Sequence, residues 1–463
     1  MLTYQDFLQV GESEEQRTSF VKRVIDQHKG TELYQTAIIA DEYDRHLNRT
    51  IMQYQKILYD VMGKAVPDIW TANYKLASRF FNRFVTQENQ FLLANGVKWV
   101  NESTADKLGK DFDTQLQKAG HKALVGGVAF GFFNMDHVEV FGVDEFAPLY
   151  DEEDGALKAG VRFWQIDDNK PMRATLYELD GYTDYMWNRR QEKDGTIVYE
   201  AEVLHEKRPY IVKVRTSAAD GDEIYDGENY PGFPIVPLWG NPQKQSEIVG
   251  LREQIDCYDL IKSGYADTVD EASIIYWTLQ NAGGMDDVDL AQFIEKMRKL
   301  HAAQTEDGVS AVPNTMDAPY ASREALLQTL RADLYEDAMA LDTKNIANGA
   351  TTATQIKAAY EPLNSKADEY EYCVIEFLHG ILTLAGIDDE PSFTRSYIIN
   401  TTEEIQTVLQ AAQYLESHYV TEKLLTLLGD GDKAEEMLKQ IDANELDLQA
   451  QMQAMPEGVE MIE

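Results

Sequence analysis

Residues 341–363 read LDTKNIANGATTATQIKAAYEPL, and this stretch decides how the second half of the chain is built. Gly349 interrupts a helical pattern, because glycine costs about 1 kcal/mol in a helix interior and the neighbouring threonines lose rotamer freedom in a helix. We predict a kinked helix that carries a small polar loop, with a plain helix–loop–helix turn as the simpler alternative. Apolar residues at helical spacing flank the break: Leu330, Leu334, Ala338 and Leu341 before it, and Ile356, Ala359 and Leu363 after it.

The composition is that of a globular protein. The chain has 463 residues, enough for two or three domains, of which 44% are hydrophobic and 26% are charged. Its 42 Lys and Arg residues stand against 80 Asp and Glu residues, so the formal net charge is −38. Such a surface repels a phosphate backbone unless basic residues are concentrated locally. Wrapping of DNA on a basic groove is therefore not expected.

The cysteines and the N-terminus indicate the compartment. Cys257 and Cys373 are far apart in helical patterns, which supports neither a disulfide framework nor a cysteine zinc site. The N-terminus is polar and acidic, and no stretch approaches the roughly 18 apolar residues of a membrane span. We expect no membrane association, and a protein of a reducing cytoplasm or of an assembly made there.

Helical patterns precede a β region. Residues 14–62, 68–95 and about 104–126 read as helices, and the pattern changes at Gly126 and Gly127. From 128 to 239, short apolar runs alternate with turn signals, which predicts an inserted antiparallel β region. Residues at three-to-four spacing predict buried positions in the second helix: Phe80, Phe81, Phe84, Phe91 and Leu92.

Two long amphipathic helices are expected next. Ser246 is a candidate N-cap for the first, and the second begins after Pro319 and Ser322. The excursion between them, residues 271–320, mixes two β-like runs with a short helix, and is either a small subdomain or an ordinary hairpin insertion. The first helix has an apolar face with Ile248, Leu251, Ile255 and Tyr258, and an opposite face with Glu253, Asp256, Asp259 and Lys262.

The C-terminal part reads as helices followed by a polar tail. Thr401 with Glu404, and Asp432 with Glu435, fit capping-box patterns. The tail after Glu445 has little to bury.

The sequence offers little for catalysis. It contains no nucleotide-binding P-loop, no zinc-protease motif and no serine-hydrolase elbow. Asp286, Asp287 and Asp289 form the tightest carboxylate group, which two-metal chemistry would need, but Asp289 more simply caps the helix that follows. We predict no catalytic residue, cofactor or metal ligand, and keep a metal-dependent hydrolase as a remote alternative.

Four stretches in order carry a family resemblance. They are KALVGGVAFGFFNMDHVEVFGVDEFAPLYDEEDG (122–155), FPIVPLWGNPQKQSEIVGLREQIDCYDLIKSGYAD (233–267), NGATTATQIKAAYEPLNSKADEYE (348–371) and YVTEKLLTLLGDGDKAEEMLKQI (419–441). Together they resemble the portal proteins of tailed bacteriophages, in particular the Gp6-like type of long-tailed phages. One departure is the short C-terminal region.

The resemblance implies an α+β fold. It is a mainly α-helical portal fold with an inserted antiparallel β region in the wing, two long stem helices, a small α/β clip and a kinked tunnel helix. The implied parts are a wing (1–244), a first stem helix (245–269), a clip (270–320), a second stem helix (321–341), a tunnel loop with the kinked helix and further wing (342–400), and a short helical crown with a polar tail (401–463).

The resemblance also implies a function without a chemical step. The chain would form a ring of twelve subunits at one capsid vertex of the virion, assembled in the host cytoplasm, through which double-stranded DNA is packaged and ejected. Implied partners are the large terminase, the major capsid protein and scaffold, and the head-completion adaptor. Another oligomeric virion structural protein is the main alternative.

Two sets of site residues follow from the resemblance. Small uncharged side chains in the tunnel loop would contact DNA without base-specific grip, and the clip would dock the terminase and then the adaptor. The tunnel-loop set is Lys344, Asn345, Asn348, Gly349, Thr351, Thr352, Thr354 and Lys357, and the clip set is Trp277, Asp286, Asp287, Lys296 and Lys299. On the stem helices, Arg252, Lys262, Arg323 and Arg331 pair with acidic groups of a neighbouring subunit, or are ordinary surface charges.

Overall fold

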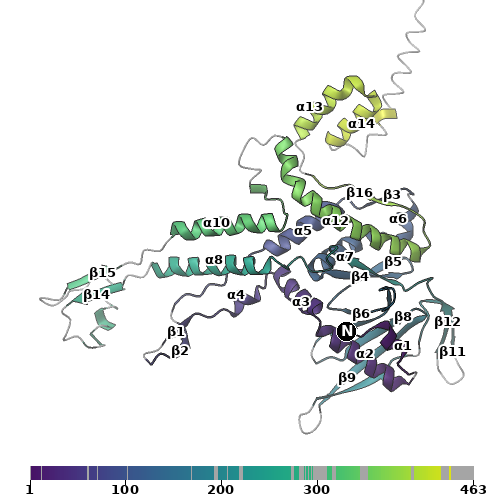
Figure 1. Cartoon of the computed structure of the whole chain (residues 1–463), viewed down its shortest axis with the longest axis horizontal. Helices are drawn as coiled ribbons and strands as arrows, with labels where there is room; N and C mark the ends of the chain where they lie inside the picture. The colour runs from purple at the N-terminus through teal and green to yellow at the C-terminus, as the bar shows by residue number, and fades with distance from the viewer. Residues whose placement is uncertain are drawn as a thin grey trace, which may run out of the picture. The chain divides into compact units, whose positions relative to one another are not determined.

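The computed structural model divides the chain into two compact units (Figure 1). The first unit comprises Met1–Leu341 and Pro362–Arg395, and the second comprises Asp342–Glu361 and Ser396–Glu463. The structure describes all residues except 1, 12, 60–61, 70, 102, 168, 192–196, 206, 218–222, 273–275, 281–285, 287, 290, 294, 296–309, 315–319, 345–352, 398–400, 429–436 and 440–463.

Side-chain caps start the first four helices. Thr3, Ser13, Thr31 and Asn48 each accept a hydrogen bond from the backbone N–H three residues later, which satisfies a donor that has no partner inside the helix. The helices are α1 (Tyr4–Leu8), α2 (Glu14–Lys29), α3 (Glu32–Asp44) and α4 (Arg49–Gln53).

The prediction of helices over residues 14–62 and 68–95 was wrong for residues 54–62 and 68–79. Residues 54–79 contain no helix where they are described, and instead carry strands β1 (Ile57–Tyr59) and β2 (Ala65–Pro67), paired as an antiparallel hairpin. Gly63 between the strands has φ +78, a conformation that glycine adopts without steric cost. The stretch that periodicity joined into one helix is therefore three helices, α2, α3 and α4, followed by a hairpin.

The predicted aromatic core is confirmed. Phe80, Phe81, Phe84, Phe91 and Leu92 are all buried on α5. All of them except Phe91 belong to one cluster with residues of α7 and of the part of α12 that lies in the first unit. The elements here are α5 (Phe80–Leu93), β3 (Val97–Trp99), α6 (Ser103–Leu108) and α7 (Phe112–Gly126).

The predicted change of pattern at the double glycine is also confirmed. Gly127 has φ +87, and a Cβ atom there would lie 3.0 Å from the carbonyl carbon of Gln245. Only glycine fits this close approach, so α7 ends and strand β4 begins at Val128.

The antiparallel β region runs from Val128 to Trp239, as predicted. One sheet has the order β10-β9-β8-β7-β6, a second has the order β13-β4-β5, and β11 pairs with β12. The strands are β4 (Val128–Asn134), β5 (His137–Gly142), β6 (Phe146–Tyr150), β7 (Leu157–Trp164), β8 (Met172–Glu178), β9 (Gly181–Gln191), β10 (Ile197–Val203), β11 (Ile211–Ser217), β12 (Glu223–Glu228) and β13 (Ile235–Trp239).

The two expected long helices are present as α8 (Arg252–Ala272) and α10 (Tyr320–Asp337). Ser246 does not cap α8 directly: its hydroxyl donates to Val125 O and accepts from Ile248 N, in a buried turn ahead of the helix. Between the helices, β14 (Tyr276–Gln280) pairs antiparallel with β15 (Ser310–Asn314), which confirms the two β-like runs.

The helical pattern near Leu341 breaks earlier than predicted. Helix α10 ends at Asp337, and Met339 has φ +52 while Ala340 N donates to Tyr335 O, a common way of closing a helix end. A new helix, α12, starts at Ala353 and runs to Ala385 with Pro362 inside it. The division between the two units falls at this proline, whose ring removes one backbone hydrogen bond of the helix.

The remaining elements are short. In the first unit, β16 (Pro391–Phe393) pairs with β3. The second unit contains the first turns of α12, together with α13 (Thr401–Ala411), the 3₁₀ turn η1 (Ala412–Tyr414) and α14 (Ser417–Leu428). Among the described helices, none is long and apolar enough to cross a membrane.

Candidate functional site

The helical pair α8–α10 projects from the core of the first unit (Figure 1). Its helices are antiparallel. At the outer end Arg323 donates to Gly264 O at 3.1 Å, and the Tyr265 and Tyr320 rings meet edge to face at 5.7 Å. At the inner end the Gln254 amide donates to the Asp337 carboxylate.

The inner end of the pair is anchored in the core. Leu334 is fully buried, and the Tyr335 hydroxyl accepts from Arg83 at 2.7 Å while its ring lies 5.2 Å from that of Phe84. Farther out on α10, Leu326 is 46% exposed. The pair therefore presents long helical faces to solvent that no described part of this chain covers.

A polar ladder fastens α8 to residues 71–78, which we call the strap. The backbone N–H groups of the strap donate to side chains one turn apart on α8. These contacts are Ser78 N to Asp259 Oδ1 at 3.0 Å, Leu76 N to Ser263 Oγ at 3.1 Å, and Tyr74 N to Asp267 Oδ1 at 2.8 Å. Every second residue of the strap donates, as in an extended chain.

The spacing of the two partners explains the ladder. Alternate N–H groups of an extended chain point to the same side and recur about every 6.7 Å, while side chains four residues apart on a helix recur about every 6 Å. An extended segment running antiparallel to a helix can therefore match it over two turns. Asp259, which the sequence places on the face of α8 opposite the apolar residues, is fully buried beneath the strap.

Burial and hydrogen bonding act oppositely on Asp259. Burial raises the pKa of this carboxyl, and the bonds from Ser78 N and from the Asn48 amide, at 2.8 Å, only partly oppose the rise. A buried carboxylate without partners would be strongly destabilising. The ladder is thus a condition for the native packing of α8.

A second polar cluster lies at the inner end of the pair. We call Glu88, Glu247 and Lys366 the junction cluster. Lys366 Nζ lies 2.8 Å from Glu88 Oε2 and 2.6 Å from Glu247 Oε2, and it also donates to Ala338 O at 3.4 Å. The cluster joins α5, the turn before α8, the end of α10 and α12.

In the junction cluster, the carboxyl groups of Glu88 and Glu247 share a single cation, the ammonium group of Lys366. Burial raises the pKa of Glu88 to about 8, since the attraction of Lys366 is offset in part by the repulsion of Glu247. Burial alone would lower the pKa of Lys366, but the two carboxylates outweigh it and the pKa is raised. Lys366 therefore stays charged, and Glu88 keeps a proton near neutral pH.

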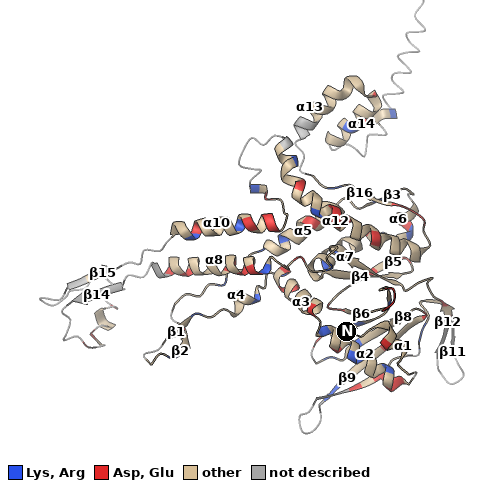
Figure 2. Ribbon diagram, in the orientation of Figure 1, with Lys and Arg blue, Asp and Glu red and all other residues tan. Residues whose placement is uncertain are grey.

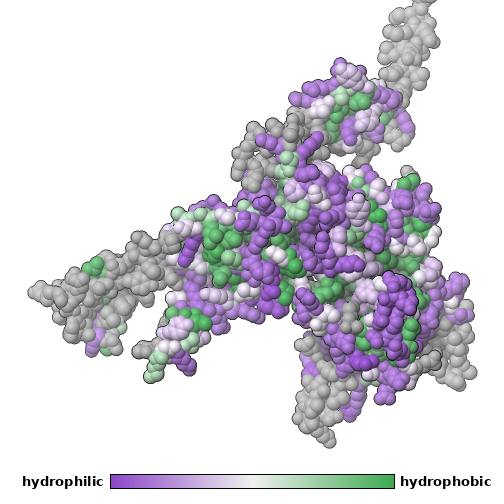
Figure 3. Space-filling view, in the orientation of Figure 1, coloured by the Kyte–Doolittle hydropathy of each residue, from purple (hydrophilic) through white to green (hydrophobic). Residues whose placement is uncertain are grey.

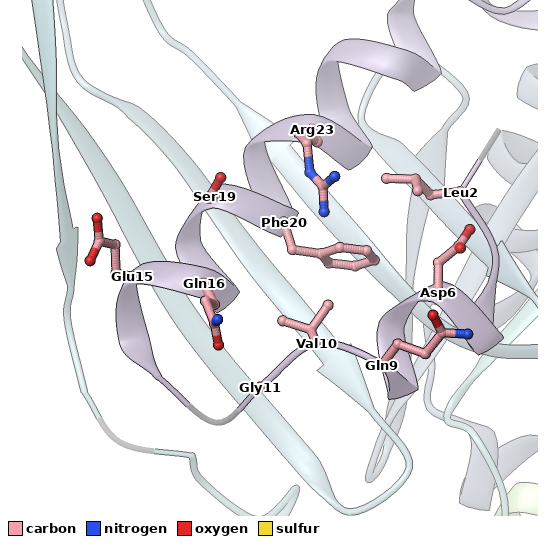
Figure 4. Close-up of a pocket in the computed structure, with 10 residues that line it drawn as sticks. All are labelled: Leu2, Asp6, Gln9, Val10, Gly11, Glu15, Gln16, Ser19, Phe20 and Arg23. Atoms are coloured by element: carbon pink, nitrogen blue, oxygen red, sulfur yellow. The ribbon is translucent and has the colours of Figure 1, made fainter.

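Two hollows lie beside polar side chains in the first unit. One, of about 400 Å³, lies beside the junction cluster, and its rim includes Gly240, Val249 and Glu369. The other, of about 660 Å³, is open between α1 and α2 (Figure 4). In it Asp6 belongs to the α1 cap, and the Arg23 guanidinium lies 5.6 Å from the Phe20 ring.

Among the described residues, no group of three or more His, Cys, Asp or Glu side chains is arranged to hold a metal ion. Asp286, rather than Asp289, starts the helical turn in the excursion, since its Oδ1 accepts from Val288 N and Asp289 N, each at 2.9 Å. The prediction that Asp289 caps this helix was therefore wrong, since the capping side chain is that of Asp286, three residues earlier. Asp287 lies outside the described residues.

The predicted tunnel-loop residues are described only at the edges of the loop. Lys344 is exposed, and its N–H donates to Asp342 Oδ1 at 3.1 Å. Thr354 and the exposed Lys357 lie in the first turns of α12. The others lie outside the described residues: Asn345, Asn348, Gly349, Thr351 and Thr352.

The predicted clip residues are likewise only partly described. Trp277 lies in β14 opposite Pro313 of β15, and Asp286 begins the short helix. Lys296 and Lys299 lie outside the described residues. The described part of the excursion is thus a two-stranded hairpin and a few helical residues at the outer end of the helical pair.

Sequence reasoning missed the strap and the junction cluster. The residues of α8 that hold the strap looked like an ordinary solvated face, because their carboxylates and hydroxyl recur at helical spacing. Lys366 did leave a signal: it lies between Leu363, Ala367 and Tyr370, which are all buried. A lysine beside an apolar helix face predicts a buried ion pair.

The body of the first unit and its protruding helical pair indicate a protein that builds an assembly. A mixed helical and antiparallel-sheet body with a protruding helical pair is suited to building a larger assembly. The family model for "Phage portal protein, SPP1 Gp6-like" matches residues 36–449. The chain therefore belongs to this family, and it is a virion component of the head–tail connector with the family's channel role in DNA packaging and ejection. The family is structural rather than enzymatic.

Individual relatives agree with the family assignment. The portal protein of Clostridium phage phiCD119 is 22% identical over 373 residues, covering 72% of this chain and 77% of the relative. The portal protein of Bacillus phage SPP1 is 22% identical over 433 residues, covering 85% of this chain and 80% of the relative.

Solved structures give weaker likenesses. The neck of a native GTA particle computed with C12 symmetry matches at a TM-score of 0.42 and 12% identity, covering 74% of this chain and 89% of that chain. The neck of an empty GTA particle computed with C6 symmetry matches at a TM-score of 0.43 and 11% identity, with 76% and 90% covered. At these TM-scores the likenesses support no inference about this chain.

Proposed function

We propose that copies of this chain form a ring of twelve subunits at one capsid vertex, whose central channel conducts double-stranded DNA. In this proposal residues 1–244 form the wing, α8 and α10 the stem, residues 270–320 the clip, residues 342–400 the tunnel loop, its kinked helix and further wing, and residues 401–463 the crown and tail. The observation that carries the proposal is the protruding helical pair, whose inner end is anchored in the core, in a chain whose family is that of phage portal proteins.

Exposed helical faces support subunit contacts within a ring. Leu260 of α8 is 41% exposed, and Leu326 of α10 is 46% exposed. Repeated head-to-tail contacts between different faces of identical subunits close into a ring when the rotation between subunits permits. The proposed wing would then meet the major capsid protein and scaffold, in a particle assembled in the host cytoplasm.

Local charge supports passage of DNA along residues 342–361. The chain as a whole has a net charge of −38, but this segment holds Asp342 and Glu361 against Lys344 and Lys357, a balance of zero. The first turn of α12 carries no acidic residue. A neutral loop with small side chains would neither repel the phosphate backbone nor hold it tightly, so DNA could slide past it.

The outer end of the helical pair supports a docking role. The hairpin β14–β15 lies there, with Trp277 and Asp286 in the described part of the excursion. In the proposal it contacts the large terminase during packaging and the head-completion adaptor afterwards. The terminase supplies ATP hydrolysis, and this chain performs no chemical step.

Electron microscopy of the purified full-length chain tests the ring directly. We expect particles with a central hole and about twelve subunits when viewed down the axis. Monomers or dimers at high protein concentration would overturn the proposal and favour another virion role.

A further inference from the structure

An exposed apolar arm projects beside α8. The arm is residues 54–69, and it consists of the β1–β2 hairpin and its flanks (Figure 1). Figure 3 shows apolar side chains on this arm. Its exposed large apolar side chains are Tyr54 (43%), Ile57 (59%), Leu58 (43%), Tyr59 (76%), Met62 (94%) and Ile69 (80%). Contiguous apolar surface of this kind marks an interaction site more often than a solvated face.

The base of the arm is held firmly to α8. Lys56 Nζ lies 3.1 Å from Asp267 Oδ2 and donates to Ala72 O at 2.6 Å. The strap continues directly from the arm, and the ladder from Tyr74 to Ser78 fixes it along the helix. A two-stranded hairpin is only marginally stable alone, so this anchoring sets the direction in which the arm projects.

A groove on the same chain matches an apolar tip. It has a volume of about 350 Å³ and lies where α8, α10 and the strap meet. Apolar side chains that are each more than 40% exposed line it: Tyr54, Tyr74, Leu260 and Leu326. A cavity of this size takes one or two large side chains, as an anchoring pocket at a protein interface does.

Charge does not oppose docking of the arm on another copy of the chain. The arm holds two lysines and two aspartates, a net charge of zero in a chain of net charge −38. Helices α8 and α10 together hold ten acidic and four basic residues, a net charge of −6 (Figure 2). Two copies repel each other overall, whereas the arm of one is not repelled by the helical pair of the next.

We infer that in the assembled ring the arm of each subunit docks into the groove between α8, α10 and the strap of the next subunit. The inference rests on the proposed ring. The arm and the groove are different surfaces of one chain, so the contact between two copies is head-to-tail and repeats around the ring. Ile57 and Tyr59, two residues apart on β1 and so on the same face of the hairpin, are the apolar anchors. The outer part of one arm thus meets the base of another.

A matched pair of variants tests the energetic role of the arm. Ile57→Asp adds a charge to the arm, and Ile166→Asp makes the same change at an isoleucine that is 86% exposed outside the arm. We expect Ile57→Asp to raise the protein concentration needed for ring assembly at least tenfold, with an unchanged circular dichroism spectrum, and Ile166→Asp to assemble as the unmodified chain does. Equal assembly of both variants overturns the inference while leaving the ring intact. Absence of rings from the unmodified chain overturns the proposed function itself.

Cross-linking tests the place of docking. Cys257 is exposed on α8, one turn before Ile261 of the groove. In the Tyr59→Cys variant, a short bifunctional maleimide should join the new thiol to Cys257 of the next copy and give a ladder of linked chains up to the full ring on a denaturing gel. The control Tyr59→Cys with Cys257→Ser should lose this ladder. A band of linked dimers alone would indicate mutual pairing, and that result or no linkage within intact rings overturns the head-to-tail contact.

Discussion

The folded chain holds a proton on Glu88 that the unfolded chain releases, so the free energy of unfolding should fall as the pH rises through neutrality. The Glu88→Gln variant should remove this pH dependence. Glu88 is 2% exposed and shares Lys366 with Glu247, and burial raises its pKa to about 8 from the ordinary value of 4.5. Glutamine resembles the protonated acid in shape and charge, but it does not titrate. The variant should therefore keep the packing of the junction cluster.

The sign and size of the effect follow from proton linkage. Between pH 4.5 and about 8 the folded chain retains the Glu88 proton and the unfolded chain has released it, so the free energy of unfolding falls as the pH rises. One retained proton corresponds to about 1.4 kcal/mol per pH unit. From pH 6 to pH 7.5 the unmodified chain should thus lose about 2 kcal/mol relative to Glu88→Gln, with the contribution fully present below pH 4.5 and gone above pH 8.

Denaturant unfolding at a series of pH values and one fixed protein concentration measures this difference. Fixing the concentration matters because subunit association also contributes to apparent stability. Glu369→Gln is the matched control, since Glu369 lies on the rim of the same hollow and is exposed. Its pH profile should follow that of the unmodified chain. Parallel profiles for Glu88→Gln and the unmodified chain would refute a proton held at Glu88.

Three further results are expected. Asp259→Ala should lower the free energy of unfolding by about 2–3 kcal/mol in denaturant titration, because Ser78 N–H and a buried amide lose their acceptor; a loss below 0.5 kcal/mol would contradict the ladder. Gly120→Ala should lower the melting temperature, because its Cβ would lie 2.0 Å from the Tyr370 hydroxyl oxygen and overpacking of about 1–3 kcal/mol outweighs the helix-propensity gain of about 1 kcal/mol; a higher melting temperature would show that the hydroxyl moves freely. Gly349→Val should reduce packaged DNA while rings seen by electron microscopy persist, and normal packaging would contradict the tunnel-loop assignment.

Much of the fold could be read from local pattern. Spacing identified the buried phenylalanines of α5, and turn residues bounded the β region from Val128 to Trp239. These predictions succeeded because side-chain periodicity and glycine geometry act within a few residues. Residues 54–62 and 68–79 were misread as helix, because short mixed stretches next to true helices continue a helical spacing without forming one.

The site was less predictable for the same physical reason. The family resemblance rested on the order of four sequence stretches, and the match over residues 36–449 confirms it. The burial of Asp259 was not predicted, because a helical wheel does not show that a distant strap will cover one polar stripe. Lys366, Glu88 and Glu247 come from segments far apart in the chain, so their shared charge balance exists only after folding.

The sequence by itself determined the class of the fold, the aromatic core, the two long helices and the family, since these depend on local periodicity and on the order of segments. Only the tertiary structure decided which polar residues are buried, how the strap holds α8, and that an apolar arm and an apolar groove occupy one chain. Those features depend on contacts between distant segments, where desolvation makes a carboxylate either a structural anchor or a solvated surface group.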